Sequence, residues 1–472
     1  MEKTIARAKS TVLIGLQYGD EGKARVMDTM LKDYQIVARF NGGANAGHTL
    51  QVGSINIALH QVPSGIFYKD MMLYIGSGCV VNPKKLLDEI KEIKSNKVKV
   101  DNRLFISGYV TLIQPHHLLF DEIYGKEIGS TKNGIGPAYA DRAMRAKRSE
   151  IKNIRFGDYV YNHKKFKSIV RDNLAHMEEK HGLSEVDIDK QVDEFDKCVM
   201  QIKKYLCNDP LMIESLVEKG KSIFFEGAQS VMLDVVTGAT PYVTSSRTIA
   251  AAAYTGGDLS NKYHYKTLGV AKAIMSRVGN GPFISEFGGG KSELYCAEGG
   301  GLDHVKEKEY GDAKPEELLA SKDLFDIGKG LRMLTGEYGA TTKRPRRIGI
   351  LDLVMLRQNC KLNGVDELYI NKFDCLAEFN KTRLPGIPIV VGYKLNGRKI
   401  NYMPVSVDEA RKVKPIIKYF PHIKEDISMF KEYGNLPAEV KGLVEFIEKF
   451  VETKVCGIGV GPEREQFILL PA

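Results

Sequence analysis

Short apolar runs alternate with amphipathic stretches along this chain of 472 residues. Runs rich in β-branched or aromatic side chains predict buried strands. They lie at Thr11–Leu16, Gln35–Phe40, Arg103–Ile106, Ser222–Phe225, Lys266–Ile274 and Leu368–Ile370. Between two of them, Asn82 caps a predicted helix that begins at Pro83 and runs to about Lys94, with apolar residues at helical spacing. Strands that alternate with helices indicate a parallel sheet with crossover helices.

One long segment, from about Asp158 to Lys219, has a helical and highly charged pattern. Breaks near Gly182-Leu183 and at Asn208-Asp209-Pro210 divide it into several helices. We interpret residues 146–220 as a helical cap with solvated charged faces and no chemistry of its own. The sequence therefore predicts an α/β fold in one domain, residues 1–472: a large mostly parallel central sheet flanked by helices, with a helical cap insertion and smaller subdomains.

Composition agrees with a soluble globular protein, since 43% of the residues are hydrophobic and 27% are charged. No apolar run approaches the roughly 20 residues that a membrane span needs. The first ten residues are polar and lack the apolar core of a secretory signal. The seven cysteines are scattered, without the paired spacing of a metal site, which indicates reduced thiols and a cytoplasmic location.

The net charge of +9 is modest for this length. It suits phosphorylated small substrates. A nucleic-acid partner would be expected to concentrate basic residues in a patch or arm, and the basic clusters here are short. We therefore expect small-molecule partners, no nucleic acid and no membrane.

A glycine-rich turn follows the first predicted strand. Gly15, Gly19 and Gly22 punctuate it, and Lys23 opens a predicted helix. A strand, a glycine turn and a helix N-terminus offer backbone N–H groups and a helix dipole to a phosphate. Asp20 adds a carboxylate, which suits metal binding or proton removal beside that phosphate. The turn is not a Walker A loop, because the glycine spacing differs and no hydroxyl follows the lysine.

A second turn, Asn41–Thr49, follows the strand predicted at residues 35–40. Its Gly and Asn residues allow the backbone to approach a ligand closely. The turn contains His48 near its end, and ligands bind at the carboxyl ends of strands in open α/β sheets. We therefore expect His48 to take part in the chemistry.

Eight motifs follow one another along nearly the whole chain: GDEGK, NGGANAGHT, STKNGIGPAY, EGAQ, PYVTSS, SRVGNGPF, GATTKRPRR and NKFD. In this order they resemble the adenylosuccinate synthetase family. The resemblance implies a GTP-dependent ligase of AMP biosynthesis that joins IMP and L-aspartate to give adenylosuccinate, GDP and phosphate. It also implies one Mg²⁺ per subunit, GTP as co-substrate and a homodimer.

By this resemblance, Asp20 removes the N1 proton of IMP while the 6-oxygen attacks the γ-phosphate of GTP. The amine of aspartate then displaces phosphate from 6-phosphoryl-IMP. His48 acts as general acid, Gln229 binds the base, and Lys23 neutralises the transferred phosphoryl group. The metal ligands are Asp20 and the backbone carbonyl of Gly47.

The resemblance also assigns residues to each ligand. The expected GTP-binding residues are Gly19, Asp20, Glu21, Gly22, Lys23, Ala24, Arg25, Arg346, Lys372, Phe373, Asp374, Gly459, Val460 and Gly461. The expected IMP-binding residues are Asn45, Ala46, Gly47, His48, Thr131, Arg145, Gln229, Thr244, Val278 and Arg344, with Arg145 reaching the IMP of the other subunit. The expected aspartate-binding residues are Ala340, Thr341, Thr342, Lys343, Arg344, Pro345 and Arg346.

Residue chemistry supports several of these assignments. Hydroxyl and guanidinium groups such as those of Thr131 and Arg145 are usual phosphate partners. Two carboxylates on an amino acid call for the hydroxyls and guanidinium groups of GATTKRPRR. In N-K-x-D, the carboxylate of Asp374 accepts from N1–H and the amine of guanine.

The chain departs from the family pattern at several positions. Ala24 and Arg25 replace Gly and Lys, Ser230 replaces Gly, Arg247 stands where Asn is expected, and Gly459 and Glu463 stand where Ser and Asp are preferred. Residues 287–334 are longer than expected and are interpreted as a surface insertion. The effect of these departures is left open.

Two other readings stay open. A sister ligase would use another 6-oxopurine nucleotide such as GMP or dGMP, but relatives of that kind replace the residue at Asp20. A GTP-binding regulatory module without ligase activity would not need Gln229 or the aspartate loop. Product analysis distinguishes the three.

Overall fold

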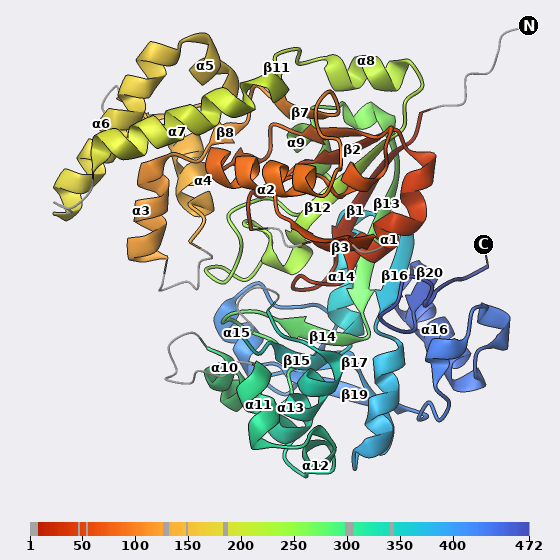
Figure 1. Ribbon diagram of the computed structural model, residues 1–472. Coiled ribbons are helices and arrows are strands. Elements are labelled where there is room, and N and C mark those ends of the chain that lie inside the picture. The colour runs from red at the N-terminus through yellow and green to blue at the C-terminus, as the bar shows by residue number, and fades with distance from the viewer. Residues whose placement is uncertain are drawn as a thin grey trace, which may run out of the picture. The chain divides into compact units, whose positions relative to one another are not determined.

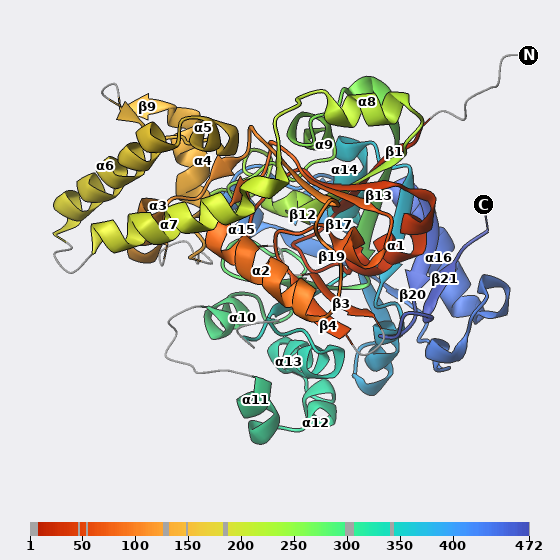
Figure 2. The same ribbon diagram turned by 45° about the horizontal axis from the view of Figure 1, so that its top comes forward.

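The structure is a computed structural model that describes residues 8–45, 48–52, 55–125, 132–147, 150–182, 187–297, 306–339 and 344–471. The chain divides into two compact units. The first comprises residues 1–13, 27–228 and 244–265, and the second comprises residues 14–26, 229–243 and 266–472. Each unit is described by itself, and Figures 1 and 2 give two views of their elements.

The first unit holds one part of a ten-stranded sheet, in the order β11-β7-β5-β2-β12-β1. The pairs β2–β5, β5–β7, β7–β11 and β2–β12 are parallel. The strands are β1 (Ser10–Gly15), β2 (Ile36–Arg39), β5 (Met72–Ile75), β7 (Leu104–Ser107), β11 (Leu206–Cys207) and β12 (Ile223–Ser230). Every residue of β1 and β2 is buried, as expected for parallel strands covered on both faces.

Helices separate these strands along the chain, and some of the helices form a group of their own. They are α2 (Pro83–Ser95), α3 (Pro115–Tyr124), α4 (Ile135–Met144), α5 (Phe156–Tyr161), α6 (His163–His181), α7 (Ile188–Ile202), α8 (Met212–Glu218) and α9 (Ala252–Gly256). Helices α3 to α7 pack against one another, and both views show them gathered together. Short strand pairs complete the unit: β3 (His48–Val52) with β4 (Ile55–Leu59), β6 (Val80–Val81) with β8 (Thr111–Leu112), and β9 (Ala146–Lys147) with β10 (Glu150–Ile151).

The second unit holds sheet strands in the order β13-β16-β20-β21. Strand β16 (Glu367–Asn371) pairs in parallel with β13 (His264–Lys272) and β20 (Lys454–Gly459), and the edge strand β21 (Phe467–Leu469) is antiparallel. A second sheet has the order β18-β17-β19, formed by β17 (Ile387–Leu395), β18 (Arg398–Ile400) and β19 (Lys414–Phe420). Strand β14 (Ile274–Arg277) pairs with β15 (Arg347–Ile350).

The helices of the second unit are α10 (Gly289–Cys296), α11 (Lys306–Asp312), α12 (Pro315–Leu319), α13 (Leu324–Thr335), α14 (Leu353–Asn363), α15 (Val407–Lys412) and α16 (Ala438–Val451). Helix α1 (Lys23–Met30) follows the glycine turn. Among the described residues, no helix is long and apolar enough to cross a membrane. The predicted α/β class, with a mostly parallel sheet and flanking helices, is confirmed.

Local chemistry explains where several elements begin. The side chain of Asn82 accepts a hydrogen bond from the backbone N–H of Lys85, and Pro83 occupies the first turn of α2, as predicted. Gly136 and Pro137 both lie in the first turn of α4. Gly134, with φ of 70°, is the residue that precedes this helix.

Helical segments occupy much of residues 156–218, with Gly182 ending α6 in a left-handed conformation. Residues 289–335 contain α10 to α13, and α13 buries Leu331 and Met333. The cap (146–220), the surface insertion (287–334) and the single domain (1–472) stay predictions.

Candidate functional site

The glycine turn lies in the second unit and is braced by Glu21. One oxygen of this buried carboxylate accepts hydrogen bonds from the backbone N–H groups of Gly19 (2.8 Å) and Gln17 (3.2 Å). The other accepts from the Ser230 hydroxyl at 2.6 Å and from Lys23 Nζ at 3.2 Å. A Cβ at Gly15 would lie 2.1 Å from Ser230 Oγ, so only glycine fits there. Glu21 thus stabilises the glycine turn through these hydrogen bonds.

Lys23 joins the turn to the EGAQ segment. Its ammonium donates to the carbonyl oxygen of Gln229 at 2.8 Å as well as to Glu21, and its side chain is 5% exposed. This lysine is therefore held by two partners.

Gln229 presents an amide with no hydrogen-bond partner among the described residues. Its Oε1 and Nε2 atoms are both buried. A buried amide without partners is costly, by about 1–3 kcal/mol, unless another molecule supplies them. An amide both donates and accepts, which suits the edge of a purine base.

Asp20 has a side chain that is 45% exposed and pairs with Arg346, with 2.7 Å between Oδ2 and the guanidinium. Arg346 also donates to the buried carboxylate of Glu337 at 2.8 Å, and its Nε atom is buried without a partner. Lys372 pairs with Glu337 as well. Two cations predicted to bind GTP are therefore joined to one carboxylate that the sequence did not single out.

The N-K-F-D motif lies against the glycine turn. The amide nitrogen of Asn371 donates to the carbonyl oxygen of Glu21 at 2.7 Å. The backbone N–H of Phe373 donates to the carbonyl oxygen of Gly459 at 2.8 Å, which connects the motif to the last predicted nucleotide loop. Burial raises the pKa of Asp374, against the opposing charges of Lys372 and Arg25.

Two departures from the family pattern contact each other. The Arg25 guanidinium donates to the carbonyl oxygen of Gly461 at 2.6 Å and to that of Pro462. A Cβ at Gly459 would lie 2.7 Å from Asn371 Oδ1 and 3.2 Å from Arg25 Nη1. The absence of a side chain at Gly459 therefore leaves room for Arg25.

Backbone strain coincides with the predicted site. Ten described non-glycine residues have a positive φ, and four of them are Asp20 (58°), Arg145 (66°), Gln229 (57°) and Lys372 (59°). Such conformations cost of order 1–3 kcal/mol and cluster at active sites and ligand clamps. The coincidence supports a functional role for these four residues.

The first unit carries other predicted residues. The Asn41 side chain donates to the carbonyl oxygen of Ala228 (3.0 Å) and accepts from its N–H (2.9 Å). Asn45 accepts from the N–H of Gly43, and His48 opens β3, although its side chain is not described. Arg145 follows α4 and is exposed. Thr244 is half-buried.

The remaining predicted residues differ in exposure, and some lie outside the described residues. Val278 is 62% exposed and Arg344 is exposed, both in the second unit. Pro345, beside them in the predicted aspartate loop, is buried. The predictions for Ala46, Gly47, Thr131, Ala340, Thr341, Thr342 and Lys343 lie outside the described residues.

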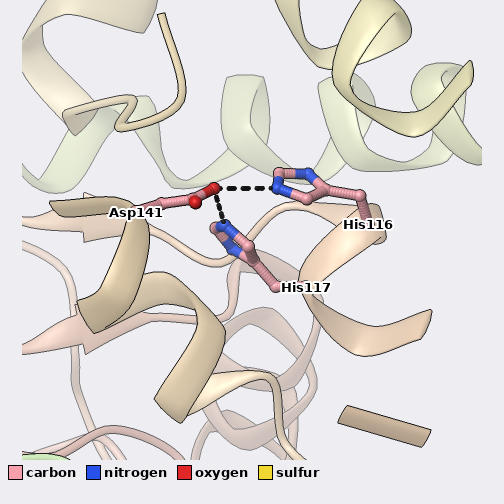
Figure 3. A group of neighbouring side chains, drawn as sticks. All are labelled: His116, His117 and Asp141. Atoms are coloured by element: carbon pink, nitrogen blue, oxygen red, sulfur yellow. Dashed lines mark hydrogen bonds and ion pairs between the residues drawn. The ribbon is translucent and has the colours of Figure 1, made fainter. Parts of the chain in front are cut away.

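A separate cluster in the first unit consists of His116, His117 and Asp141 (Figure 3). Both Nε2 atoms lie 3.0 Å from Asp141 Oδ2. This geometry resembles a metal site, but His117 Nδ1 accepts a hydrogen bond from the backbone N–H of Gln114. Its Nε2 therefore carries the proton and donates to Asp141. The cluster is a hydrogen-bonded connection between α3 and α4.

Comparisons with known proteins agree with these features. The model of the adenylosuccinate synthetase family matches residues 12–468. "Adenylosuccinate synthetase 2" of Cupriavidus pinatubonensis is 40% identical over 99% of both chains. The adenylosuccinate synthetase of Acetivibrio thermocellus is 36% identical over 97% of this chain and 99% of its own.

Two solved structures are also similar. The fully ligated adenylosuccinate synthetase from Plasmodium falciparum matches with a TM-score of 0.81 and 31% identity, over 98% of this chain and 99% of that one. The cyanophage S-2L succinoaminodeoxyadenylate synthetase bound to dGMP and dATP matches with a TM-score of 0.58 and 18% identity, over 98% of this chain and 96% of that one. The second likeness shows a shared fold.

The α/β sheet, the braced glycine turn and the adjoining N-K-F-D motif define a nucleotide-dependent enzyme. The chain belongs to the adenylosuccinate synthetase family. Its class is that of GTP-dependent carbon–nitrogen ligases that join IMP and L-aspartate in the synthesis of AMP.

Proposed function

We propose that Asp20, Lys23, His48 and Gln229 carry the ligase reaction in this chain. The observation that supports this most directly lies in the second unit. There the glycine turn is hydrogen-bonded to Gln229 through Lys23 and to the N-K-F-D motif through Asn371. The glycine turn, the amide of Gln229 and the N-K-F-D motif, which we assign to phosphate, purine and guanine, are thus joined by contacts between segments far apart in sequence.

The reaction has two balanced steps. Asp20 takes the N1 proton of IMP, and the electron pair passes to O6, which attacks the γ-phosphorus of GTP as the bond to the β,γ-bridging oxygen breaks. GDP leaves. The amine of aspartate then attacks C6, the C6–O6 bond breaks, and O6 departs within inorganic phosphate while the amine loses a proton. His48 donates a hydrogen bond to developing charge, and Lys23 stabilises the transferred phosphoryl group.

Magnesium fits the donor chemistry of the turn. Mg²⁺ prefers oxygen ligands, and the half-exposed Asp20 carboxylate is available once Arg346 releases it. Glu21 is not available, because four donors occupy its oxygens. Asp20 and the carbonyl of Gly47 are the proposed ligands, one ion per subunit. The ion neutralises charge on the phosphate oxygens when it is bound.

The remaining ligand assignments follow the family pattern. We assign GTP to the glycine turn, Arg25, Arg346, residues 372–374 and residues 459–461. IMP is assigned to residues 45–48, Thr131, Thr244, Val278, Arg344 and the partner subunit's Arg145 in a homodimer. Aspartate is assigned to residues 340–346. A cytoplasmic location completes the proposal.

Product analysis tests the proposal. The protein is incubated with IMP, L-aspartate, GTP and Mg²⁺, and each component is left out in turn. We expect adenylosuccinate, GDP and phosphate in equal amounts, and none of them when any one component is missing. Consumption of GTP without adenylosuccinate would support a regulatory GTP-binding module. Faster turnover with GMP or dGMP in place of IMP would support the sister ligase.

A further inference from the structure

Glu337 is a buried carboxylate outside the set of predicted site residues. Helix α13 ends at Thr335, Gly336 adopts a left-handed conformation, and Glu337 follows directly. Its backbone N–H donates to the carbonyl oxygen of Arg332 (3.0 Å), and its carbonyl oxygen accepts from the N–H of Arg346 (3.0 Å). The backbone therefore fixes where this side chain can point.

Four side chains donate to the two oxygens of Glu337. Ser276 Oγ lies 2.7 Å from Oε2, and Lys272 Nζ lies 3.2 Å from both oxygens. Arg346 Nη1 lies 2.8 Å from Oε2, and Lys372 Nζ donates to Oε1. The side chains of Glu337 and Lys272 are each 1% exposed. Water therefore does little to offset the charges of this cluster.

Three cations surround one anion at this position. Burial alone would raise the pKa of Glu337, but Lys272, Lys372 and Arg346 together hold its pKa well below the usual value. Loss of this negative charge would leave Lys272 buried beside two other cations. An uncompensated buried charge is strongly unfavourable, so the cations would move apart.

The carboxylate lies where three segments of the second unit meet. Through Arg346 it is connected to Asp20. Through Lys372 it is connected to the N-K-F-D motif. Lys272 exchanges two backbone hydrogen bonds with the side chain of Gln17 in the glycine turn, at 2.9 and 3.0 Å. One charge therefore controls the spacing of groups that the proposed function assigns to GTP and to proton removal.

We propose that Glu337 is a positioning residue for the GTP site, which holds Arg346 and Lys372 at a fixed separation and orients Asp20 through Arg346. The inference rests on the proposed function, because it takes Arg346 and Lys372 to be GTP-binding residues. Glu337 acts through Arg346 and Lys372, to which its carboxylate is bonded. The inference predicts that the affinity for GTP depends on the charge of Glu337 and not only on the shape of its side chain.

The test is Glu337→Gln, which keeps the shape and the Ser276 contact but removes the charge. We expect the dissociation constant for GTP, measured by calorimetry, and the KM for GTP to rise about 10- to 100-fold, the range for lost hydrogen bonds to charged groups. The KM for IMP should change much less. Calorimetry does not depend on turnover, so the inference is tested even where activity is lost.

Glu286→Gln is the matched control. Glu286 is also a buried carboxylate of the second unit, paired with Arg347, with both side chains 2% exposed. This variant should lower Tm and leave GTP affinity unchanged. Equal GTP affinity in Glu337→Gln and Glu286→Gln would overturn the inference.

A second variant separates positioning from stability. Lys272→Met added to Glu337→Gln removes the buried unpaired cation, so it should recover Tm while GTP binding stays weak. If Tm and the affinity for GTP both recover in the double variant, Glu337 has a structural role only. If the wild-type protein binds GTP but makes no adenylosuccinate, the proposed function fails while the inference about GTP binding is still decided by these variants.

Discussion

Asp20 combines an exposed carboxylate, a left-handed backbone and an ion pair with Arg346. The guanidinium of Arg346 occupies the carboxylate while no substrate is bound. For Asp20 to accept the N1 proton, Arg346 must turn toward a ligand, with Glu337 still holding its other end. The residue proposed to remove the proton is thus linked to residues proposed to bind the phosphate donor.

Asp20→Asn should abolish turnover and leave nucleotide binding measurable. The amide keeps the shape but cannot act as a base and is a poor metal ligand. Loss of a general base typically costs about 10²–10⁴-fold in rate, and the lost metal contact adds to this. The measurement is the steady-state rate together with calorimetric GTP binding. Activity within tenfold of wild type would remove Asp20 from the proposed role.

Asp374→Asn should lower kcat/KM for GTP as the phosphate donor and raise kcat/KM for XTP. Xanthine has a carbonyl where guanine has an amine, so an amide can donate where the carboxylate accepted. The loss of a hydrogen bond to a charged group corresponds to about 1.5–3 kcal/mol, which is measured as the ratio of kcat/KM for the two donors. An unchanged ratio would show that Asp374 does not read the base.

The sequence supplied the catalytic candidates and missed their supporting residues. Asp20, Lys23 and Gln229 stand in short motifs whose residue types indicate chemistry. Glu337 has no such motif, and its partner Lys272 lies 65 positions away in the chain. A contact of that separation is created by folding, so local pattern does not reveal it.

At the scale of elements, α4 is held by its neighbours along its whole length. The N–H of Gly134, just before the helix, donates to Asp121 of α3 at 2.7 Å. Midway, the Tyr139 hydroxyl bonds to the N–H of Gly42 and to the carbonyl oxygen of Gly78. Near its end, Asp141 accepts from His116 and His117. The helix that carries Arg145 at its end therefore has a fixed position in the first unit.

The buried His117 predicts that the folded protein becomes less stable as the pH falls. Burial, with the neighbouring His116, lowers the pKa of His117 to about 3 from an ordinary value of 6.5. At a pH between these two pKa values the unfolded chain binds a proton that the folded chain does not. The contribution of His117 to the free energy of unfolding is therefore complete above pH 6.5 and is lost progressively as the pH falls below that value. The slope approaches about 1.4 kcal/mol per pH unit for one such group.

His117→Gln should remove this slope, as measured by the free energy of unfolding from urea titrations at pH 5, 6 and 7. His176→Gln is the control, since His176 is an exposed residue of α6. The expected result is a flatter pH dependence for His117→Gln and an unchanged one for His176→Gln. Identical slopes in all three proteins would contradict the assignment.

Element boundaries were predicted where local signals are strong. The Asn82-Pro83 start of α2 and the glycine end of α6 follow from capping chemistry. The sheet β18-β17-β19 was not predicted, and its edge strand β19 lacks a clean alternation of buried and exposed positions. Pro137 lies in the first turn of α4, a position where proline is tolerated.

At the scale of the whole molecule, the proposed homodimer predicts rescue between two inactive variants. Arg145→Leu lacks the guanidinium group that is proposed to bind IMP in the partner subunit. Asp20→Asn lacks the proposed base at its own site. In a mixed dimer one of the two sites has both. With free exchange and random pairing, half of the dimers are mixed, so about a quarter of wild-type activity should return.

The assay mixes the two variants after subunit exchange has been shown independently, for example with differently tagged chains. Each variant mixed with itself is the control. A mixture that stays as inactive as its components would place Arg145 in its own subunit or on the surface.

Transfer of oxygen from IMP to phosphate tests the central claim most directly. IMP labelled with ¹⁸O at the 6-position is converted with unlabelled GTP, L-aspartate and Mg²⁺, and the inorganic phosphate is analysed by mass spectrometry. Because O6 attacks the γ-phosphorus and leaves with it, every phosphate formed with adenylosuccinate should contain one ¹⁸O atom. Unlabelled phosphate alongside adenylosuccinate would mean that GTP is hydrolysed by water and that 6-phosphoryl-IMP is not formed.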